Sequence, residues 1–163
     1  MVTRLELVRG EATPAHPVRA VRGAITVAAD DAALVRAATI ELLEAMLARN
    51  GLQPEQLVSV IFTVTPDLAS EFPARAAREL GWHDVPMLCA QEIAVPGALP
   101  RCVRILLHAE TSRPRVLIHH VYLRDAVTLR PDLTADAPEA LVSGRDGILS
   151  LAEAAAAAWP EGA

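Results

Sequence analysis

A chain of 163 residues in which 52% are apolar is long enough for one domain with a sizeable core, and its 3% aromatic content means that aliphatic side chains build that core. The net charge of −5 argues against a nucleic-acid partner, which usually requires a basic face. No apolar run reaches the ~18 residues of a membrane span, and residues 1–17 lack the apolar segment of a signal peptide. We therefore expect a cytoplasmic protein without a membrane partner.

The residue types also exclude several kinds of chemistry. All fifteen basic side chains are arginine, so neither a lysine Schiff base nor a P-loop lysine is possible. Cys89 and Cys102 lack CxxC spacing, and we expect both thiols to be reduced. No histidine or aspartate lies at a sequence spacing from Cys89 that would indicate a catalytic pair, which favours an inert thiol over a nucleophile. His119 and His120 are neighbours in an expected strand and point to opposite faces, so we expect no metal site there.

The first third of the chain predicts a strand followed by a helix. Residues 18–27 alternate and include β-branched side chains, as a strand does. Asp30 or Asp31 then supplies an N-cap, and apolar residues recur at three- and four-residue steps. The pair Asn50 and Gly51 ends this helix, because glycine readily adopts the left-handed conformation of a helix C-terminus.

The middle of the chain predicts a strand, a helix and a second strand. Residues 57–64 are rich in β-branched side chains and predict a strand. After a turn at 65–67, a helix is expected over 69–80, with Pro73 marking a break or a fresh start within it. Residues 85–89 predict a short buried strand.

Further strands are expected at 101–109, 116–123 and 126–129, and Pro131 ends the ordered pattern. Residues 148–159 predict an alanine-rich helix. The order of elements indicates an α/β (α+β) domain with one mixed sheet. The expected segments are an N-terminal extension (1–17), a folded domain (18–133) and a C-terminal tail (134–163).

Three polar side chains, Glu92, Arg104 and Tyr122, follow or interrupt apolar runs that otherwise predict core strands. Burying a charge costs several kcal/mol unless a partner compensates it. The partner of Arg104 is either Glu92, in a buried ion pair, or an anionic ligand, and the composition leaves both alternatives open. Four more arginines lie at element ends, where ligand sites form but where solvated arginines are also common: Arg22, Arg75, Arg78 and Arg130.

Seven short sequence motifs follow one another along the chain, at residues 21–27, 65–68, 72–80, 85–92, 102–104, 120–123 and 129–133. In this order they resemble the monofunctional chorismate mutases of the small trimeric α/β-barrel (AroH) type. Each segment alone is a weak signal, whereas the ordered set is specific. The resemblance covers the chain from Val18 to Leu133.

The resemblance implies a mixed-sheet subunit with helices packed outside, which assembles into a homotrimer with a pseudo-barrel core. The active sites would lie in clefts between subunits. The implied reaction is the Claisen rearrangement of chorismate to prephenate, a step in phenylalanine and tyrosine biosynthesis. It is unimolecular and needs no metal, cofactor or covalent intermediate.

The resemblance also implies roles for the residues at the matching positions. Arg104 would stabilise the negative charge that develops on the ether oxygen, and Arg22 would bind a substrate carboxylate. Glu92 would accept a hydrogen bond from the ring hydroxyl. Tyr122 would donate to a carboxylate, and Cys89 would line the pocket near the hydroxyl. The remaining implied substrate-binding residues are the apolar walls Phe72 and Leu129 and the arginines near the mouth, Arg75, Arg78 and Arg130.

One departure and two rival interpretations accompany the resemblance. Arg75 stands where a lysine is familiar, so the charge is kept while the shape differs. One rival is a trimeric imine or enamine deaminase, which has a similar subunit and a carboxylate-binding arginine between subunits. The other is a trimer that binds a small dicarboxylate without catalysis. Glu92, Tyr122 and residues 129–133 favour the mutase over the deaminase.

Overall fold

The structure is a computed structural model in which residues 16–133 are described. Nearly all of the expected N-terminal extension lies outside these residues, as does the C-terminal tail with the alanine-rich helix expected at 148–159. Within the described range, no helix has the length and apolar character needed to cross a membrane.

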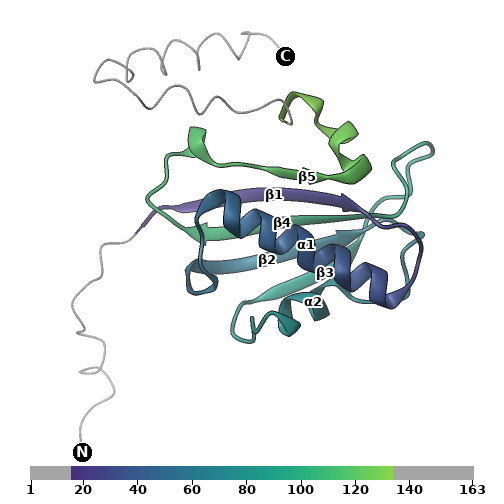
Figure 1. Ribbon diagram of the computed structural model, residues 1–163, viewed down its shortest axis with the longest axis horizontal. Coiled ribbons are helices and arrows are strands. Elements are labelled where there is room, and N and C mark those ends of the chain that lie inside the picture. Colours follow the sequence, from purple (N-terminus) through teal and green to yellow (C-terminus); the bar gives the residue numbers. More distant parts are fainter. Residues whose placement is uncertain (1–15, 134–163) are drawn as a thin grey trace, which may run out of the picture.

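The described residues form one mixed sheet of five strands in the order β3-β2-β4-β1-β5 (Figure 1). The centre is antiparallel, because β4 pairs with both β1 and β2, whereas each edge strand runs parallel to its neighbour. This arrangement confirms the expected mixed sheet. The strands are β1 (Val18–Thr26), β2 (Leu57–Val64), β3 (Met87–Gln91), β4 (Cys102–Glu110) and β5 (Val121–Leu123).

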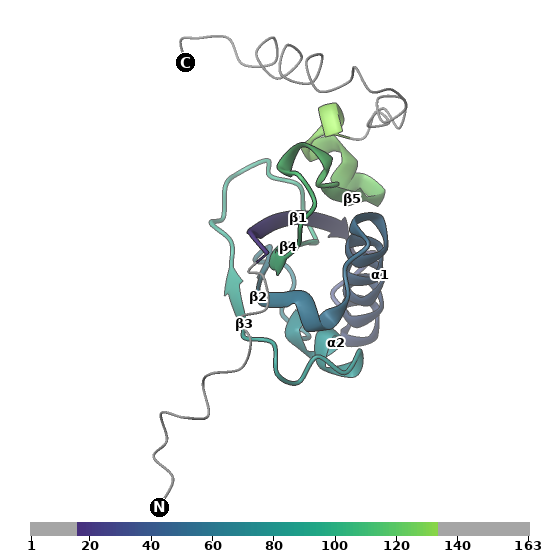
Figure 2. The same cartoon turned by 90° about the vertical axis from the view of Figure 1, so that its left-hand side faces the viewer.

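Both helices, α1 (Ala32–Asn50) and α2 (Pro73–Glu79), lie on the same side of the sheet (Figure 2). The core between them and the sheet includes Phe62 and Met46, which are fully buried. Gly23 lets α1 approach β1 closely, since a Cβ there would overlap Met46 Sδ. No described α-helix covers the opposite face of the sheet, where only the 3₁₀ helix at Arg124–Leu129 packs over one end, so alternate residues of the central strands point away from the main core.

The ends of α1 follow the expected signals. Asp31 is the N-cap, and its Oδ1 accepts hydrogen bonds from the backbone N–H groups of Ala33 and Leu34 at 2.9 and 3.0 Å. Gly51 ends the helix in the left-handed conformation with φ 60°. The alternative cap Asp30 instead accepts hydrogen bonds from the chain at 69–70, across the loop before α2.

The helix expected over 69–80 is shorter than predicted, because α2 begins only at Pro73. The N–H groups of residues 69–70 donate to Asp30 Oδ1 and hold this segment in a loop. Phe72 is extended, as the residue before a proline prefers to be. Proline fits the first position of a helix, where its missing N–H costs nothing, so the fresh-start alternative was right.

Strand β3 begins later than the expected span of 85–89 and runs to Gln91. Pro86 has no N–H to give to a ladder, although its carbonyl accepts from the N–H of Val60 at 2.9 Å. Regular pairing with β2 therefore starts at Met87.

The strand expected at 116–123 is mostly wrong, since only β5 (Val121–Leu123) is extended. A 3₁₀ turn occupies Arg115–Leu117. The carbonyl and N–H of His119 are both bonded to the side chain of Asn50, which keeps them out of a ladder.

The strand expected at 126–129 is also wrong, because Arg124–Leu129 forms a 3₁₀ helix. Arg124 adopts φ 54°, which turns the chain away from the sheet. Thr26 Oγ1 accepts from the N–H of Asp125 at 3.2 Å and fixes the turn against the end of β1. The apolar pattern arose because this helix buries Ala126.

Asn50 joins the end of α1 to the segment before β5 and is almost completely buried. Its Nδ2 donates to the carbonyls of Met46 and His119 at 2.9 and 2.8 Å, and its Oδ1 accepts from the N–H of His119 at 2.8 Å. One side chain thus satisfies both backbone groups of a residue outside the ladder.

We expect Asn50→Ala to destabilise the fold by about 1–3 kcal/mol, because it leaves the His119 N–H and carbonyl without partners. Chemical denaturation measures the change. Glu44→Ala, at an exposed position of the same helix, is the control and should change stability little. Equal losses in the two variants would contradict the anchoring role.

His120 continues the edge between β1 and β5 by means of its side chain. Backbone pairing with β5 starts at Gly23 opposite Val121. Just before it, the N–H of Arg22 donates to His120 Nδ1 at 3.1 Å. This bond requires a neutral ring whose proton is on Nε2. Burial lowers the pKa of His120 below its ordinary value, and the charges of Arg22, Arg130 and Arg115 lower it further.

A lowered histidine pKa means that the unfolded chain binds the proton first as the pH falls. The stabilisation by His120 is therefore complete above about pH 6.5, the ordinary histidine pKa, and is lost as the pH falls from there through the folded-state pKa. To test this, the denaturation midpoints of the wild type, His120→Asn and the control His119→Asn are measured in steps of about one pH unit from pH 8 to pH 5. The His120→Asn protein should show a flatter acid slope than the other two, and an unchanged slope would contradict the assignment.

Candidate active site

The uncovered face of the sheet carries a cavity of about 480 Å³ between its central strands and the segment after β5. This volume is suitable for a small metabolite. The cavity forms here because β1, β2 and β4 direct alternate side chains away from the helices. It is lined by Arg22, Gly23, Ala24, Ile61, Thr63, Arg104, Ile105, Leu106, Tyr122, Leu129 and Arg130.

Arg104 lies on this face in the middle of the cavity wall and forms an ion pair with Glu92. Its Nη1 is 2.9 Å from Glu92 Oε2, and the two side chains are 38% and 14% exposed. The expected charge partner is therefore present, although Arg104 is half-buried rather than within the core. Its Nε is buried and makes no hydrogen bond within residues 16–133. A ligand in the cavity can therefore reach Arg104 only through the exposed part of its guanidinium and not through Nε.

Glu92 is itself held by a residue that the sequence interpretation did not select. Thr63 Oγ1 donates to Glu92 Oε1 at 2.5 Å. The N–H of Glu92 donates to the carbonyl of Val64 at 2.9 Å, which extends the β2–β3 edge past β3. Thr63 also stands opposite Arg104 in the β2–β4 register. A polar side chain within the apolar run 57–64 was the available signal, but the register that gives it meaning is not visible in one sequence.

A small second core supports the tyrosine side of the cavity. Ala24, Cys102 and Ala126 are buried together, with Tyr122 and Leu129 packed against them. Burial raises the pKa of the Cys102 thiol, which outweighs the opposing effect of the nearby Arg104 charge. A neutral thiol beneath Arg104 leaves Glu92 as the carboxylate that balances this arginine.

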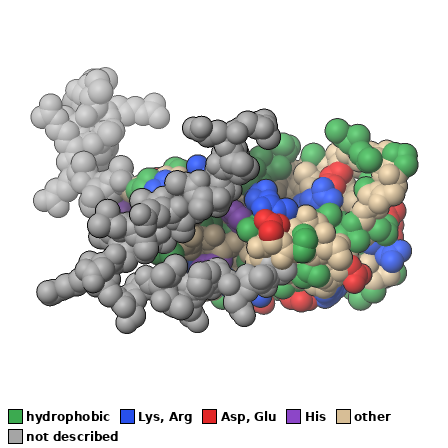
Figure 3. Space-filling model, turned by 90° about the horizontal axis from the view of Figure 1, so that it is seen from above, with side chains coloured by type: hydrophobic (Ala, Val, Ile, Leu, Met, Phe, Trp, Pro, Cys, Tyr) green, Lys and Arg blue, Asp and Glu red, His purple; other side chains and the backbone are tan. Residues whose placement is uncertain are grey.

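The rim of the cavity is cationic. Figure 3 views the side on which β5 and the following turns lie, and arginine side chains (blue) gather there beside acidic ones (red). Arg130 forms a close pair with Asp132, in which Nη2 and Oδ2 are 2.6 Å apart, and this pairing raises the pKa of Arg130. Arg22 takes part in none of the ion pairs among the described residues. Its charge is therefore free to attract an anion.

Other residues selected from the sequence lie elsewhere in the same chain. Phe72 and Cys89 line a second cavity of about 290 Å³, bounded by the start of α2 and by β3. Cys89 pairs in register with Phe62, so it faces the helix side of the sheet rather than the arginine cavity. Arg75 and Arg78 are exposed on α2 and line neither cavity. One subunit thus brings together six of the ten expected residues: Glu92 pairs with Arg104, and the cavity is lined by Arg22, Arg104, Tyr122, Leu129 and Arg130.

Comparison with known proteins agrees with this geometry. The profile of the family described as chorismate mutase type I matches residues 18–133. The chorismate mutase AroH of Thermus thermophilus is 56% identical over 117 residues, which cover 71% of this chain and 96% of that protein. The chorismate mutase AroH of Bacillus subtilis is 43% identical over 118 residues, or 72% of this chain and 93% of that protein.

A solved structure, a chorismate mutase from Clostridium thermocellum, has the same fold. It matches with a TM-score of 0.67 and 44% identity, over 68% of this chain and 98% of its own. A family profile that spans the whole described domain, together with two relatives well above 30% identity, establishes the relationship. The chain belongs to the chorismate mutase type I family.

Proposed function

We propose that this protein is an isomerase that converts chorismate to prephenate by a non-covalent Claisen rearrangement, and so serves phenylalanine and tyrosine biosynthesis. The observation that carries the proposal is the Arg104 guanidinium, which is held by Glu92 and partly exposed at the wall of a cavity that also presents Arg22, Arg130 and Tyr122. Chorismate is a dicarboxylate, and a cavity with several fixed cations suits such a ligand.

The rearrangement breaks one C–O bond as one C–C bond forms, and no proton or group passes to the protein. Negative charge grows on the ether oxygen as the C–O bond lengthens. We assign the exposed N–H groups of the Arg104 guanidinium to this oxygen. Because Glu92 already holds Nη1, the guanidinium is oriented before substrate arrives, and it stabilises the transition state more than the substrate.

The other residues bind and shape the substrate. We assign a carboxylate to Arg22 and a second donor to that carboxyl region to Tyr122, with Leu129 as an apolar wall and Arg130 at the rim. We assign the ring hydroxyl to Glu92 Oε1, which also accepts from Thr63 Oγ1 and has a second lone pair for the substrate. Holding the compact diaxial conformer contributes further, because it brings the two reacting carbons together.

Phe72 and Cys89 belong to the same site only if two subunits meet. We propose a homotrimer in which the second cavity of one subunit, with Arg75 and Arg78 near its mouth, closes over the arginine cavity of its neighbour. The uncovered sheet face supports this proposal, because apolar side chains such as Leu88 are exposed there. Three open sheets would then form the pseudo-barrel core. We also propose a cytoplasmic location, which the free thiols of Cys89 and Cys102 support.

Mixing purified protein with chorismate and following the loss of its ultraviolet absorbance tests the activity. We expect Arg104→Ala to lose about 3–5 kcal/mol of transition-state stabilisation, or roughly 10²–10⁴-fold in kcat/KM. Arg104→Lys should fail as well, because a point charge cannot replace the fixed fork. Arg49→Gln, on the exposed end of α1, is the control. Near-wild-type turnover by Arg104→Ala would sink the assigned role.

Coexpression of two defective variants tests the shared site. The Arg104→Ala subunit keeps a native second cavity with Phe72, and the Phe72→Ala subunit keeps a native arginine cavity with Arg104. If a site takes one half from each of two neighbours, about one quarter of the sites in random mixed trimers carry both native halves. Activity of the mixture should then exceed the sum of the two separate variants. No gain, in trimers confirmed by light scattering, would place each complete site within one subunit.

The same assay separates the remaining alternative. Saturable binding of chorismate without formation of prephenate would indicate a dicarboxylate-binding trimer rather than an enzyme. The ion pair between Glu92 and Arg104 favours the enzyme, since simple binding of a carboxylate does not require a guanidinium that is already oriented on one side.

A further inference from the structure

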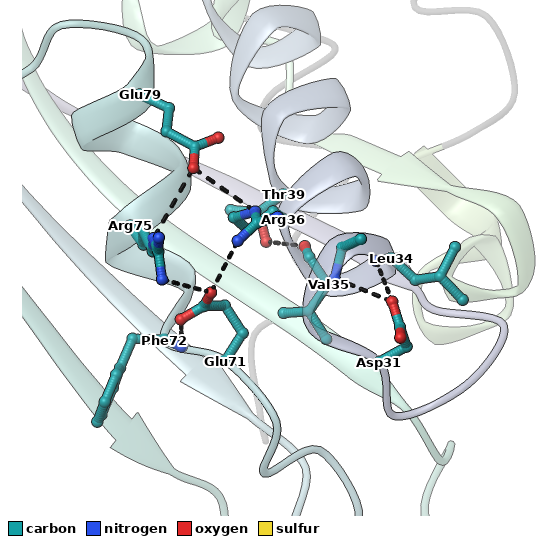
Figure 4. Close-up of polar contacts among 10 residues, drawn as sticks. Asp31, Leu34, Val35, Arg36, Thr39, Glu71, Phe72, Arg75 and Glu79 are labelled. Carbon is teal, nitrogen blue, oxygen red and sulfur yellow. Dashed lines mark hydrogen bonds and ion pairs between the residues drawn. The ribbon is translucent and has the colours of Figure 1, made fainter.

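Glu71 stands immediately before Phe72 at the edge of the second cavity, and its side chain is only 8% exposed. Its Oε1 accepts from the N–H of Phe72 at 3.0 Å. Its Oε2 lies 3.2 Å from Arg36 Nη1 on α1 and 3.3 Å from Arg75 Nη1 on α2. One carboxylate therefore connects both helices with the backbone of the aromatic residue (Figure 4).

A second carboxylate completes the cluster. Glu79 Oε1 lies 3.5 Å from Arg36 Nε and 3.8 Å from Arg75 Nε. Figure 4 shows both arginines between the two glutamates. Arg36, Arg75, Glu71 and Glu79 together carry no net charge, and each arginine directs Nη1 to Glu71 and Nε to Glu79. We call these four residues the α1–α2 ion cluster.

The α1–α2 ion cluster does not contribute mainly to the stability of the fold. Arg75 and Glu79 are 59% and 45% exposed, and ion pairs this exposed contribute little to folding. Glu71 is different, because a nearly buried carboxylate beside a cavity needs compensation. Phe72, in contrast, is 72% exposed although aromatic, which is unusual unless another surface or a ligand covers it.

We propose that Arg75 assists substrate binding by neutralising Glu71, not by contacting the substrate, and that Glu71 is a positioning residue that holds Phe72 at the cleft. The proposal rests on the proposed function, in which the second cavity closes over a dianionic substrate. Without Arg75 the cluster would keep two glutamates against Arg36 alone, and its net negative charge would repel the substrate. Two nitrogens of Arg75 already face Glu71 and Glu79. The geometry of Arg75 therefore suits neutralisation of these carboxylates better than direct binding of the substrate.

Four variants test the proposal by steady-state kinetics with chorismate: Arg75→Gln, Glu71→Gln, the double variant and Arg75→Lys. We expect Arg75→Gln to raise KM about 5–10-fold with kcat within about twofold, the size expected for one unbalanced charge near a charged ligand. Glu71→Gln keeps an oxygen that accepts from Phe72 N–H and should leave KM near wild type. The double variant, again neutral, should return KM to within about twofold of wild type, as should Arg75→Lys.

Arg49→Gln changes net charge by the same amount outside the cluster and should leave KM unchanged. Thermal unfolding of every variant separates a structural effect, since a purely structural cluster would make the double variant less stable and no better in KM. A double variant as impaired as Arg75→Gln would overturn the proposal and assign Arg75 to direct substrate contact. A wild-type protein that fails to convert chorismate would instead overturn the proposed function, and this proposal with it.

Discussion

The ion pair between Glu92 and Arg104 is the contact on which the rest of the site depends. A guanidinium in the central strand of a sheet needs a compensating charge, and Glu92 supplies it from just beyond β3. The pair engages one side of the arginine and leaves Nε without a partner in the described part of the chain. Thr63 holds the far oxygen of Glu92, so neither charge can swing freely. Orientation that is fixed before substrate binds is what electrostatic catalysis requires.

This pair can face a ligand because both helices lie on the other side of the sheet. Gly23 has no side chain, which lets α1 pack closely against β1 on the helix side of the sheet. The adjacent residue, Arg22, lines the cavity. The arrangement leaves a sheet face with exposed apolar groups, and it leaves two of the ten expected site residues, Phe72 and Cys89, in a different cavity. Association of subunits would resolve both features at once, which is why the proposed trimer and the proposed activity are linked.

Charge compensation recurs around both cavities, so the excess of acidic residues in the chain does not by itself make these cavities negative. Glu92 is balanced by Arg104, Asp132 by Arg130, and Glu71 by two arginines. Of the three arginines that line the first cavity, Arg104 and Arg130 form ion pairs within residues 16–133 and Arg22 does not, so the cation that we assign to a carboxylate is the cavity arginine without an acidic partner there. The net charge of −5 therefore says little about the local field at the site.

The sequence by itself determined the element order up to β4, the N-cap and C-cap of α1, the mixed sheet and the family, because these depend on local periodicity, capping residues and short ordered motifs. It failed at 116–129, where side chains of Asn50 and Thr26, distant in sequence, take the backbone groups that a longer strand would need. It also selected Arg104 and Glu92 without deciding whether they pair. Only the tertiary structure placed Thr63 opposite Arg104, Glu71 between two arginines and Phe72 in a separate cavity from Arg22, because register and helix packing set which distant residues meet.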